Sequence, residues 1–363
     1  MSSKSQHQSM QWTIPKTGKH LETLEKSQTT VPISGSNESE SESENLPAGT
    51  VLIKLHAASL NYRDLLIARG QYPFPVNFPI VPGSDGAGEI VRLGPGCSRG
   101  FKKGDRVVTL FNQKHIYGAV DEAGTNSGLG GALDGIFREY AVFSEEGLVK
   151  APKNLDWGEA ATLTCAGVTA WNALFGGGGQ HLRAGQTVLV QGTGGVSLFA
   201  LQFAKAAGAT VIATTSSKEK EEMLKKLGAD FVLNYTEDKD WGTSAKKMTS
   251  GGTGVDFVIE VGGKGTLEQS LKAIKYEGVI SIIGFLGGAD AQPTLIACLS
   301  HICTARGVYV GSRALLEDMV AAIEANDIHP VIDEKRFKLE ELDKAYQHMW
   351  DKKHIGKIVI DIA

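Results

Sequence analysis

A glycine-rich turn between a strand-like run and a helix-like run constrains this chain more than any other feature. The continuous apolar run TVLVQ, residues 187–191, is typical of a buried strand. GTGGVS follows directly, and then LFALQFAKAAG, a helical run that ends at Gly208, a residue suited to a helix C-terminus. Further apolar runs (TVIATT, FVLN, VDFVIEV and GVISIIGF) alternate with helical stretches such as KEKEEMLKKLG. This alternation predicts a parallel sheet with helices on both faces.

The first part of the chain has a different pattern. From Thr50 onward, short apolar segments such as FPIVPGSDGAGEIVRLGPG and KKGDRVVTL are punctuated by glycine and proline, which predicts a β-rich domain. The C-terminal run HIGKIVIDIA predicts one more strand, which returns to this first domain. Residues 112–135 are glycine-rich and aperiodic, so we expect a long surface loop or a mobile flap there.

Two segments are predicted to lack regular structure. Residues 1–9 are polar and predict a disordered tail. In SNESESESEN, residues 36–45, serine alternates with glutamate; the like charges repel one another and offer nothing to bury. A solvated loop is the simplest interpretation of this acidic segment. A segment that is phosphorylated at Ser39, Ser41 and Ser43 is the alternative.

Composition excludes several classes of protein. The 363 residues are enough for two or three domains with a core that needs no disulfides. The net charge of -4 excludes a strongly basic nucleic-acid binder, and a hydrophobic content of 42% excludes a wholly disordered chain. The four cysteines form no CxxC pair, and no apolar run reaches the ~18 residues that cross a bilayer. We therefore expect a cytoplasmic protein that binds neither nucleic acid nor a membrane.

The glycine turn has the pattern of a dinucleotide-binding loop. Glycine lets the backbone approach a pyrophosphate closely, and a helix N-terminus offers unpaired N–H groups to the anion. The third small position of the G-x-G-x-x-G pattern is Ser197 instead of glycine. A tight turn with no ligand is the alternative. The residues predicted to contact the cofactor here are Gly192, Thr193, Gly194, Gly195 and Val196.

The end of the next strand predicts which dinucleotide is bound. NAD-binding proteins carry a carboxylate at this point, which holds the ribose 2′-hydroxyl. This chain has TTSSK there, and hydroxyls with a lysine suit a 2′-phosphate. A hydrogen bond to a charged group contributes roughly 1.5–3 kcal/mol, about tenfold to a hundredfold in affinity. NADPH is therefore favoured over NADH, with Glu219 and Glu221 nearby as opposing charges. The residues predicted at the 2′-phosphate are Thr215, Ser216, Ser217 and Lys220.

Taken together, these motifs resemble the medium-chain dehydrogenase/reductase superfamily. The resemblance runs from about Met10 to the C-terminus and is carried by HAASLNYRDLLIARGQYP, PGSDGAGEIVRLG, FKKGDRV, AATLTCAGVTAWNAL, VLVQGTGGVS and TTSSKEK. It implies an α/β fold with a GroES-like β-rich catalytic domain plus a Rossmann domain, a doubly wound parallel sheet. The implied ranges are 10–153 with 313–363 for the catalytic domain and 154–312 for the Rossmann domain. It also implies an active site in the cleft between the domains.

The same resemblance implies a homodimer that forms through Rossmann-domain edge strands near residues 307–311. Zinc alcohol dehydrogenases of this superfamily have a cysteine where this chain has Asn61, and a His-Glu pair where it has Ser84 and Asp85. Their third ligand, a cysteine, corresponds to Cys165. Asparagine and serine are poor zinc ligands beside cysteine and histidine, so the chain resembles the zinc-free, quinone-oxidoreductase-like branch, and we predict no metal.

Loss of zinc favours one class of reaction. Zinc lowers the pKa of bound water from about 15.7 to about 7, which is worth roughly 12 kcal/mol toward an oxyanion. Reducing an activated double bond needs less, because hydride adds to the β-carbon and hydrogen-bond donors can stabilise the enolate. The sequence thus predicts NADPH-dependent reduction of a small carbonyl substrate: an enone, an enal or a quinone. The alternatives are a metal-free alcohol or ketone oxidoreductase, a partner-dependent enoyl reductase, and a non-catalytic NADPH-binding scaffold or sensor.

Candidate site residues follow from the same resemblance. Asn61 is predicted to hydrogen-bond the substrate or to orient the nicotinamide, and Asp64 to anchor the loop that carries it. Tyr62 and Tyr72 are candidate hydrogen-bond donors. The structural alternatives are a turn residue for Asn61 and core packing for the two tyrosines. The resemblance further implies cofactor contacts at Thr169, Tyr235, Gly262, Gly263, Ile283 and Gly284.

Overall fold

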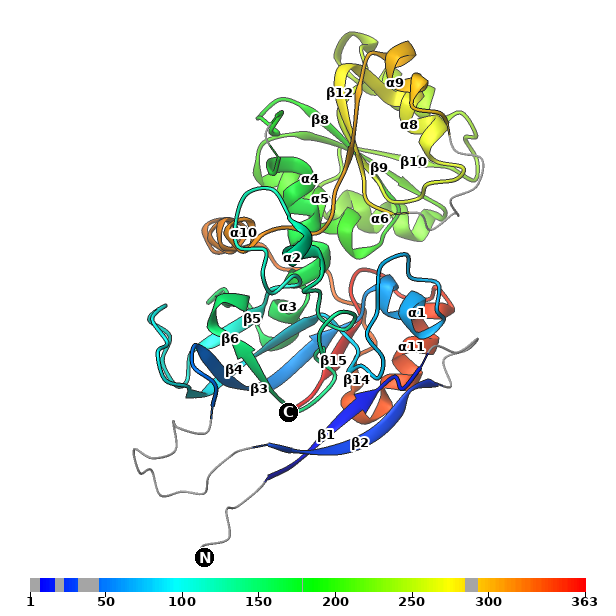
Figure 1. The fold of residues 1–363 in the computed structure, drawn as a ribbon. Coiled ribbons are helices and arrows are strands. Elements are labelled where there is room, and N and C mark those ends of the chain that lie inside the picture. Colours follow the sequence, from blue (N-terminus) through cyan, green and yellow to red (C-terminus); the bar gives the residue numbers. More distant parts are fainter. Residues whose placement is uncertain (1–6, 17–22, 32–45, 178, 285–292) are drawn as a thin grey trace, which may run out of the picture. The chain divides into compact units, whose positions relative to one another are not determined.

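The chain divides into two compact units. The structure is a computed structural model of the 363-residue chain, and it describes all residues except 1–6, 17–22, 32–45, 178 and 285–292 (Figure 1). One unit comprises residues 1–165 with 312–363, and the other comprises residues 166–311. The sequence placed the first boundary after residue 153. In the structure α3 (Trp157–Ala161) contacts β3, β4 and β15 of the first unit, which moves the boundary beyond this helix.

The first unit is built on a seven-stranded sheet of order β14-β15-β3-β4-β5-β7, with β6 paired to β3. The central strands β3 (Thr50–Ser59) and β4 (Asp85–Leu93) are antiparallel. The C-terminal strand pairs with β3, as the sequence predicted for a strand that returns to this domain. The other strands are β5 (Arg106–Thr109), β6 (Tyr140–Ser144), β7 (Leu148–Lys150), β14 (Phe337–Lys338) and β15 (Val359–Asp361).

The remaining elements of this unit include one that the sequence did not predict. A separate hairpin of β1 (His7–Thr13) and β2 (Glu25–Val31) begins inside the segment 1–9, which was expected to be disordered. Pairing with β2 satisfies the backbone of β1, and Ser9 is fully buried. The acidic segment 36–45 lies outside the described residues. The other helices are α1 (Tyr62–Ala68), α2 (Glu122–Thr125), α10 (Arg313–Asn326) and α11 (Leu342–Trp350).

Residues 112–135 are more ordered than their composition suggested. The segment contains α2, and backbone bridges pair Asn112 with Gly128 and Leu129 with Leu133. Asn112 and Leu129 are buried, so much of the segment is packed and only part of it behaves as the predicted surface loop. In the part of the chain that the structure describes, no helix has the length and apolar character needed to span a membrane.

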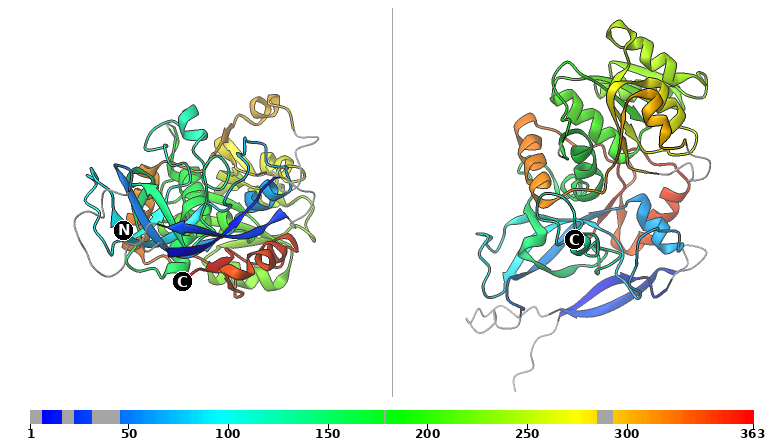
Figure 2. Two further views of the ribbon diagram at one scale, coloured as in Figure 1. Left: turned by 60° about the horizontal axis from the view of Figure 1, so that its bottom comes forward. Right: turned by 45° about the horizontal axis from the view of Figure 1, so that its top comes forward.

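The second unit is a six-stranded parallel sheet of order β10-β9-β8-β11-β12-β13, with helices packed against it (Figure 1 and Figure 2). The strand order reverses between β8 and β11, and ligands bind such sheets at the carboxyl ends of the strands at this switch point. The strands are β8 (Thr187–Gln191), β9 (Thr210–Thr215), β10 (Phe231–Asn234), β11 (Val255–Glu260), β12 (Ile274–Ile282) and β13 (Thr304–Gly307). The helices are α4 (Val168–Phe175), α5 (Gly195–Ala206), α6 (Lys218–Lys226), α7 (Trp241–Met248), α8 (Leu267–Ala273) and α9 (Ile296–His301).

Candidate active site

A buried lysine organises the polar residues at the ends of β3 and β4 in the first unit. This lysine is Lys357, and only 3% of its surface is exposed, while Asp85 is fully buried. The Lys357 ammonium Nζ donates hydrogen bonds to Asp85 Oδ2 (3.1 Å), Asn61 Oδ1 (2.5 Å) and the Leu60 carbonyl (2.7 Å). An ammonium has three donors, so each one of Lys357 has an acceptor. The carboxylate of Asp85 supplies the compensating charge.

The side chains at the positions of the zinc ligands are bonded to one another. Asn61 Nδ2 donates to Ser84 Oγ (3.3 Å), and Ser84 Oγ donates to Asp85 Oδ1 (2.9 Å). Burial and the nearby Asp85 charge raise the pKa of Cys165 to about 12, and a thiol must lose its proton to bind a metal. A zinc ion does not fit this donor set, because a buried ammonium already lies against Asn61 and Asp85. No cluster of three or more potential metal ligands occurs among the described residues.

Asp64 holds the backbone of Asn61 in place. Its Oδ2 accepts the Asn61 N–H at 2.8 Å, which closes a capping box at the start of α1. Its Oδ1 pairs with the Arg63 guanidinium at 3.2 Å, and that guanidinium also donates to the Leu129 carbonyl at 3.0 Å. Arg63 and Asp64 are both buried, so the ion pair is shielded from solvent. The Asn61 side chain is thereby carried on a rigid turn.

The two tyrosines lie close to this turn and pack against the hydrophobic core of the unit. Tyr62 is the first residue of α1. The Arg63 guanidinium lies 5.0 Å from the centre of the Tyr72 ring and 4.7 Å from that of Phe111. Asn61, Tyr62, Asp64 and Tyr72 are thus brought together in one region by α1 and the segment that follows it.

The ionisation of Asp64 gives stability a pH dependence of unusual sign. Burial raises the pKa of Asp64 from 3.8 to about 6, against the opposing effects of Arg63 and the Asn61 N–H. The folded state therefore binds this proton more tightly than the unfolded state does, and the contribution to stability falls as pH rises from about 4 to about 6. We expect the difference in unfolding free energy between wild type and Asp64→Asn to fall by about 2 kcal/mol between pH 4 and pH 7.

Denaturant titrations of both proteins across this pH range measure that difference in unfolding free energy. Titrating groups that do not interact with Asp64 contribute equally to both proteins and cancel in the difference. A constant difference, or one that grows with pH, would contradict the assignment.

In the second unit the glycine turn offers open backbone to a ligand. Gly192 follows β8 with φ 73°, a conformation that favours glycine, and Gly194 precedes the first turn of α5. A Cβ atom at either glycine would meet no other atom within 4 Å, so the space beside both is free. Ser197 Oγ donates to the Gln191 carbonyl at 2.6 Å, which ties α5 to the end of β8. This bond explains why serine replaces the third glycine of the pattern.

A buried carboxylate arranges the strand ends beside the glycine turn. Glu260, the last residue of β11, is fully buried, and it accepts five hydrogen bonds from neighbouring segments. Gln191 Oε1 also accepts the Val261 N–H at 3.3 Å, so hydrogen bonds of the Gln191 side chain link the carboxyl ends of β8 and β11. The donors to Glu260 are Gln191 Nε2 (2.8 Å), Gly262 N (3.0 Å), Gly263 N (2.9 Å), Thr266 Oγ1 (2.5 Å) and Ser270 Oγ (2.5 Å).

Most of the other predicted cofactor residues lie at this same edge of the sheet. Ile283 and Gly284 follow β12, and the N–H of Ile283 donates to the Glu260 carbonyl at 2.9 Å. The N–H of Tyr235 donates to the Thr215 carbonyl at 3.0 Å, which places the exposed Tyr235 ring beside the end of β9. Thr169 lies in α4, which contacts α5 and β11.

The segment after β9 is arranged as a helix start. Ser217 caps α6, and its Oγ accepts the Lys220 N–H at 3.4 Å. Thr215 Oγ1 accepts the Ser217 N–H at 3.4 Å, and Ser216 between them is exposed. The hydroxyl of Ser216 and the helix N-terminus therefore lie together at the end of β9.

Known proteins share both halves of this architecture. The family model described as "Alcohol dehydrogenase GroES-like domain" matches residues 47–153, and the one described as "Zinc-binding dehydrogenase" matches residues 195–325. A zinc-type alcohol dehydrogenase-like protein of Schizosaccharomyces pombe is 50% identical over 323 residues, which cover 88% of this chain and 92% of the relative. The chain belongs to the medium-chain dehydrogenase/reductase superfamily. The sequence prediction of this superfamily and of its two-domain fold is confirmed.

As a member of this superfamily the protein is an oxidoreductase, and the superfamily uses nicotinamide cofactors. An acryloyl-coenzyme A reductase of Metallosphaera sedula is 33% identical over 86% of this chain and 92% of its own length. The crystal structure of a putative alcohol dehydrogenase from Sinorhizobium meliloti has a TM-score of 0.85, with 39% identity over 99% of this chain and all of the other.

Sequence reasoning missed three residues that shape these sites. Lys357 and Glu260 both lie in apolar runs, and a charged residue within such a run is the signal that was available. A charged residue that is buried in a strand needs a partner, which marks it as a candidate for an internal ion pair or hydrogen-bond network. Gln191, the third residue, ends a buried strand and carries no comparable signal.

Proposed function

We propose that the protein is a zinc-independent, NADPH-dependent oxidoreductase that reduces an activated carbonyl compound, an enone, an enal or a quinone. The observation that carries this proposal is the Lys357 ammonium bonded to Asn61 and Asp85, at positions where zinc alcohol dehydrogenases hold their metal. A divalent cation there would have to displace a buried ammonium that has all three donors satisfied. Without zinc, reduction of a conjugated double bond is the least demanding reaction for this fold, because its charge spreads into an enolate.

Asn61 is suited to orient the reacting groups. The bond from Lys357 fixes Oδ1 of its amide, so the Nδ2 end must be the donor. One of the two Nδ2 hydrogens bonds Ser84, and the second remains for a substrate oxygen or the nicotinamide amide. When bound, NADPH supplies the hydride for the β-carbon. Tyr72 and Tyr62 are the candidate donors for the proton that the α-carbon or the oxygen then takes up.

Two further observations support the proposal. The strand end after β9 offers the exposed Ser216 and a helix N-terminus to the adenosine ribose, and hydroxyls stand at residues 215–217 where NAD-binding proteins carry a carboxylate. Glu219 and Glu221 follow in the first turn of α6 as opposing charges. The relative named acryloyl-coenzyme A reductase acts, by its name, on an activated double bond. The half-buried free cysteines fit the proposed cytoplasmic setting.

The test follows NADPH consumption by chelator-treated protein with a panel of enones, enals and quinones. NADP⁺ with simple alcohols runs in parallel. We expect turnover of activated double bonds that does not change when zinc is removed or added. Turnover of alcohols alone would contradict the proposal and favour a metal-free alcohol oxidoreductase. Tight NADPH binding with no turnover of any compound would favour a scaffold.

We also propose that the protein forms a homodimer through β13, an edge strand of the parallel sheet. The neighbouring helix α9 exposes large apolar side chains, with Leu295 87% and Leu299 72% exposed. An exposed apolar face beside an unpaired strand edge is typical of an association surface. We expect the double variant Leu295→Glu/Leu299→Glu to sediment as a monomer at concentrations where the wild type is a dimer.

Phe231→Glu is the matched control for this prediction. Phe231 is 40% exposed on β10, at the opposite edge of the same sheet, and its replacement should leave the dimer intact. Sedimentation of the wild type as a monomer, or dissociation by Phe231→Glu alone, would contradict the proposed interface.

A further inference from the structure

Two cysteines flank the C-terminal end of α9. The N–H of Ile302 donates to the Leu299 carbonyl at 3.2 Å, and the N–H of Cys303 donates to the Cys298 carbonyl at 3.0 Å. Ile302 itself adopts the left-handed conformation, with φ 48° and ψ 54°. These features together define a Schellman motif, in which the chain reverses sharply after the helix.

The reversal brings the two thiols into contact. In a Schellman motif, the third residue from the helix end and the residue after the left-handed position lie against each other, and their side chains are usually apolar. Here these two residues are Cys298 and Cys303, and the two thiols interact electrostatically with each other. The backbone hydrogen bonds of the turn hold the Cα atoms of Cys298 and Cys303 near each other, whatever rotamers the two side chains adopt.

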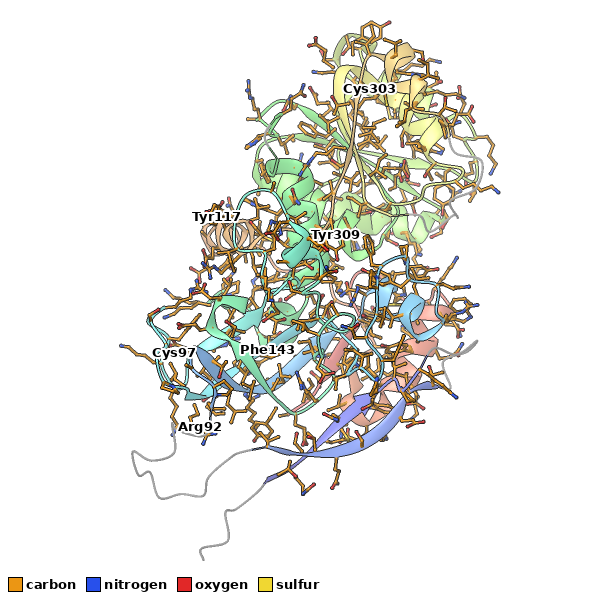
Figure 3. All side chains as sticks on the ribbon, viewed as in Figure 1. Arg92, Cys97, Tyr117, Phe143, Cys303 and Tyr309 are labelled. Carbon is orange, nitrogen blue, oxygen red and sulfur yellow. The ribbon has the colours of Figure 1, made fainter. Side chains whose placement is uncertain are left out.

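Cys303 differs in its surroundings from the exposed apolar residues of α9. Cys303 packs against the hydrophobic core beneath the helix, whereas Leu295, Leu299 and Ile302 are exposed (Figure 3 labels Cys303). Both cysteines are half-buried, so a small oxidant can reach them while larger molecules are hindered.

We propose that Cys298 and Cys303 form an oxidisable dithiol, a modification site that peroxides convert into an intramolecular disulfide. One thiolate attacks a peroxide oxygen, the O–O bond breaks, and a sulfenic acid and hydroxide form. The second thiol attacks this sulfur and displaces its oxygen, so that the two thiols and one hydrogen peroxide yield one disulfide and two waters. The two sulfurs lose two electrons in total and the two peroxide oxygens gain them. A dithiol reductant reverses the change.

The surroundings of the thiols set how fast this occurs. Burial, with a contribution from Cys298, raises the pKa of Cys303 to about 11, so the thiol is protonated at neutral pH. Because the thiolate is the nucleophile, the raised pKa slows attack by Cys303 at neutral pH. The disulfide would join the end of α9 to the residue that precedes β13 and hold the strained turn at Ile302 closed. This inference does not depend on the proposed reductase activity.

The test exposes the full-length protein to hydrogen peroxide, denatures it, alkylates the remaining thiols and maps the peptides by mass spectrometry. We expect Cys298 and Cys303 to escape alkylation together, joined within one chain, while Cys97 and Cys165 remain free. Dithiothreitol added after the peroxide and before alkylation should restore all four thiols. Cys298→Ser and Cys303→Ser should each abolish the disulfide, and the conservative Cys97→Ser should leave it unchanged.

Several results would overturn the proposal. Full alkylation of both cysteines after peroxide treatment that oxidises the half-buried Met223 would show that the pair does not react. A bond between two chains, visible on a non-reducing denaturing gel, would show that the partner is wrong. Oxidation of one cysteine to a sulfinic acid while the other stays free would show that the thiols do not meet. None of these outcomes bears on turnover of a carbonyl substrate.

Discussion

Replacing Lys357 by methionine is expected to destabilise the protein by about 3–5 kcal/mol, because it leaves Asp85 as a buried charge without a counter-ion. The variant also removes the donor that fixes the Asn61 amide. Asp85 is fully buried, and among the described residues it retains hydrogen bonds only from neutral hydroxyls, those of Ser59 at 3.0 Å and Ser84 at 2.9 Å. Unfolding in urea, monitored by fluorescence and by circular dichroism, measures the loss.

Lys344→Met is the matched control for this experiment. The Lys344 ammonium pairs with Glu341 at 2.9 Å, but both side chains are exposed, so the loss should be below about 1 kcal/mol. The double variant Lys357→Met/Asp85→Asn removes both buried charges and should recover part of the stability of the single variant. Equal losses for Lys357→Met and Lys344→Met would show that the buried ion pair does not organise the site.

The second large effect is expected at the end of β9. A carboxylate introduced as Ser216→Asp would repel a 2′-phosphate and accept a hydrogen bond from a free 2′-hydroxyl. We expect the wild type to bind NADPH more tightly than NADH by about tenfold to a hundredfold, and the variant to lose this preference or to reverse it. Titration of both cofactors, followed by the quenching of protein fluorescence, measures the ratio of dissociation constants.

Thr253→Asp provides the comparison for Ser216→Asp. Thr253 is also exposed, but it precedes β11 and therefore lies at the amino-terminal edge of the sheet, away from the carboxyl ends of the strands. The same charge placed there should leave the preference unchanged. A wild type that prefers NADH, or a ratio that Ser216→Asp does not alter, would contradict the assignment of this segment to the 2′-phosphate.

The parts of the fold that were predictable depend on local pattern. The turn at Gly192 has a buried strand before it and a helix after it within a few residues, so a short stretch of sequence is enough to predict its place in the sheet. The alternation of strands and helices likewise predicted the parallel sheet. By contrast, β1 begins with the polar residues 7–9, which carry no hydrophobic signal, and its apolar residues Met10 and Trp12 come only after them.

The candidate site was predictable only in part, because its key bonds join distant segments. Lys357 and Asn61 are 296 residues apart in the chain, and Gln191 and Glu260 are 69 residues apart. No single-sequence pattern links such pairs. The resemblance supplied Asn61 and Asp85 as positions that had lost zinc ligands, but only the structure shows that an ammonium bonds to both.

The most direct test of the account uses NADPH that carries deuterium at the transferable position of the nicotinamide, with chelator-treated protein and an α,β-unsaturated aldehyde. Such a substrate can accept hydride at the β-carbon or at the carbonyl carbon, so the product reveals the reaction class. We expect the product to be a saturated aldehyde with deuterium on the β-carbon. An allylic alcohol with deuterium on the former carbonyl carbon, or transfer only after zinc is added, would contradict it.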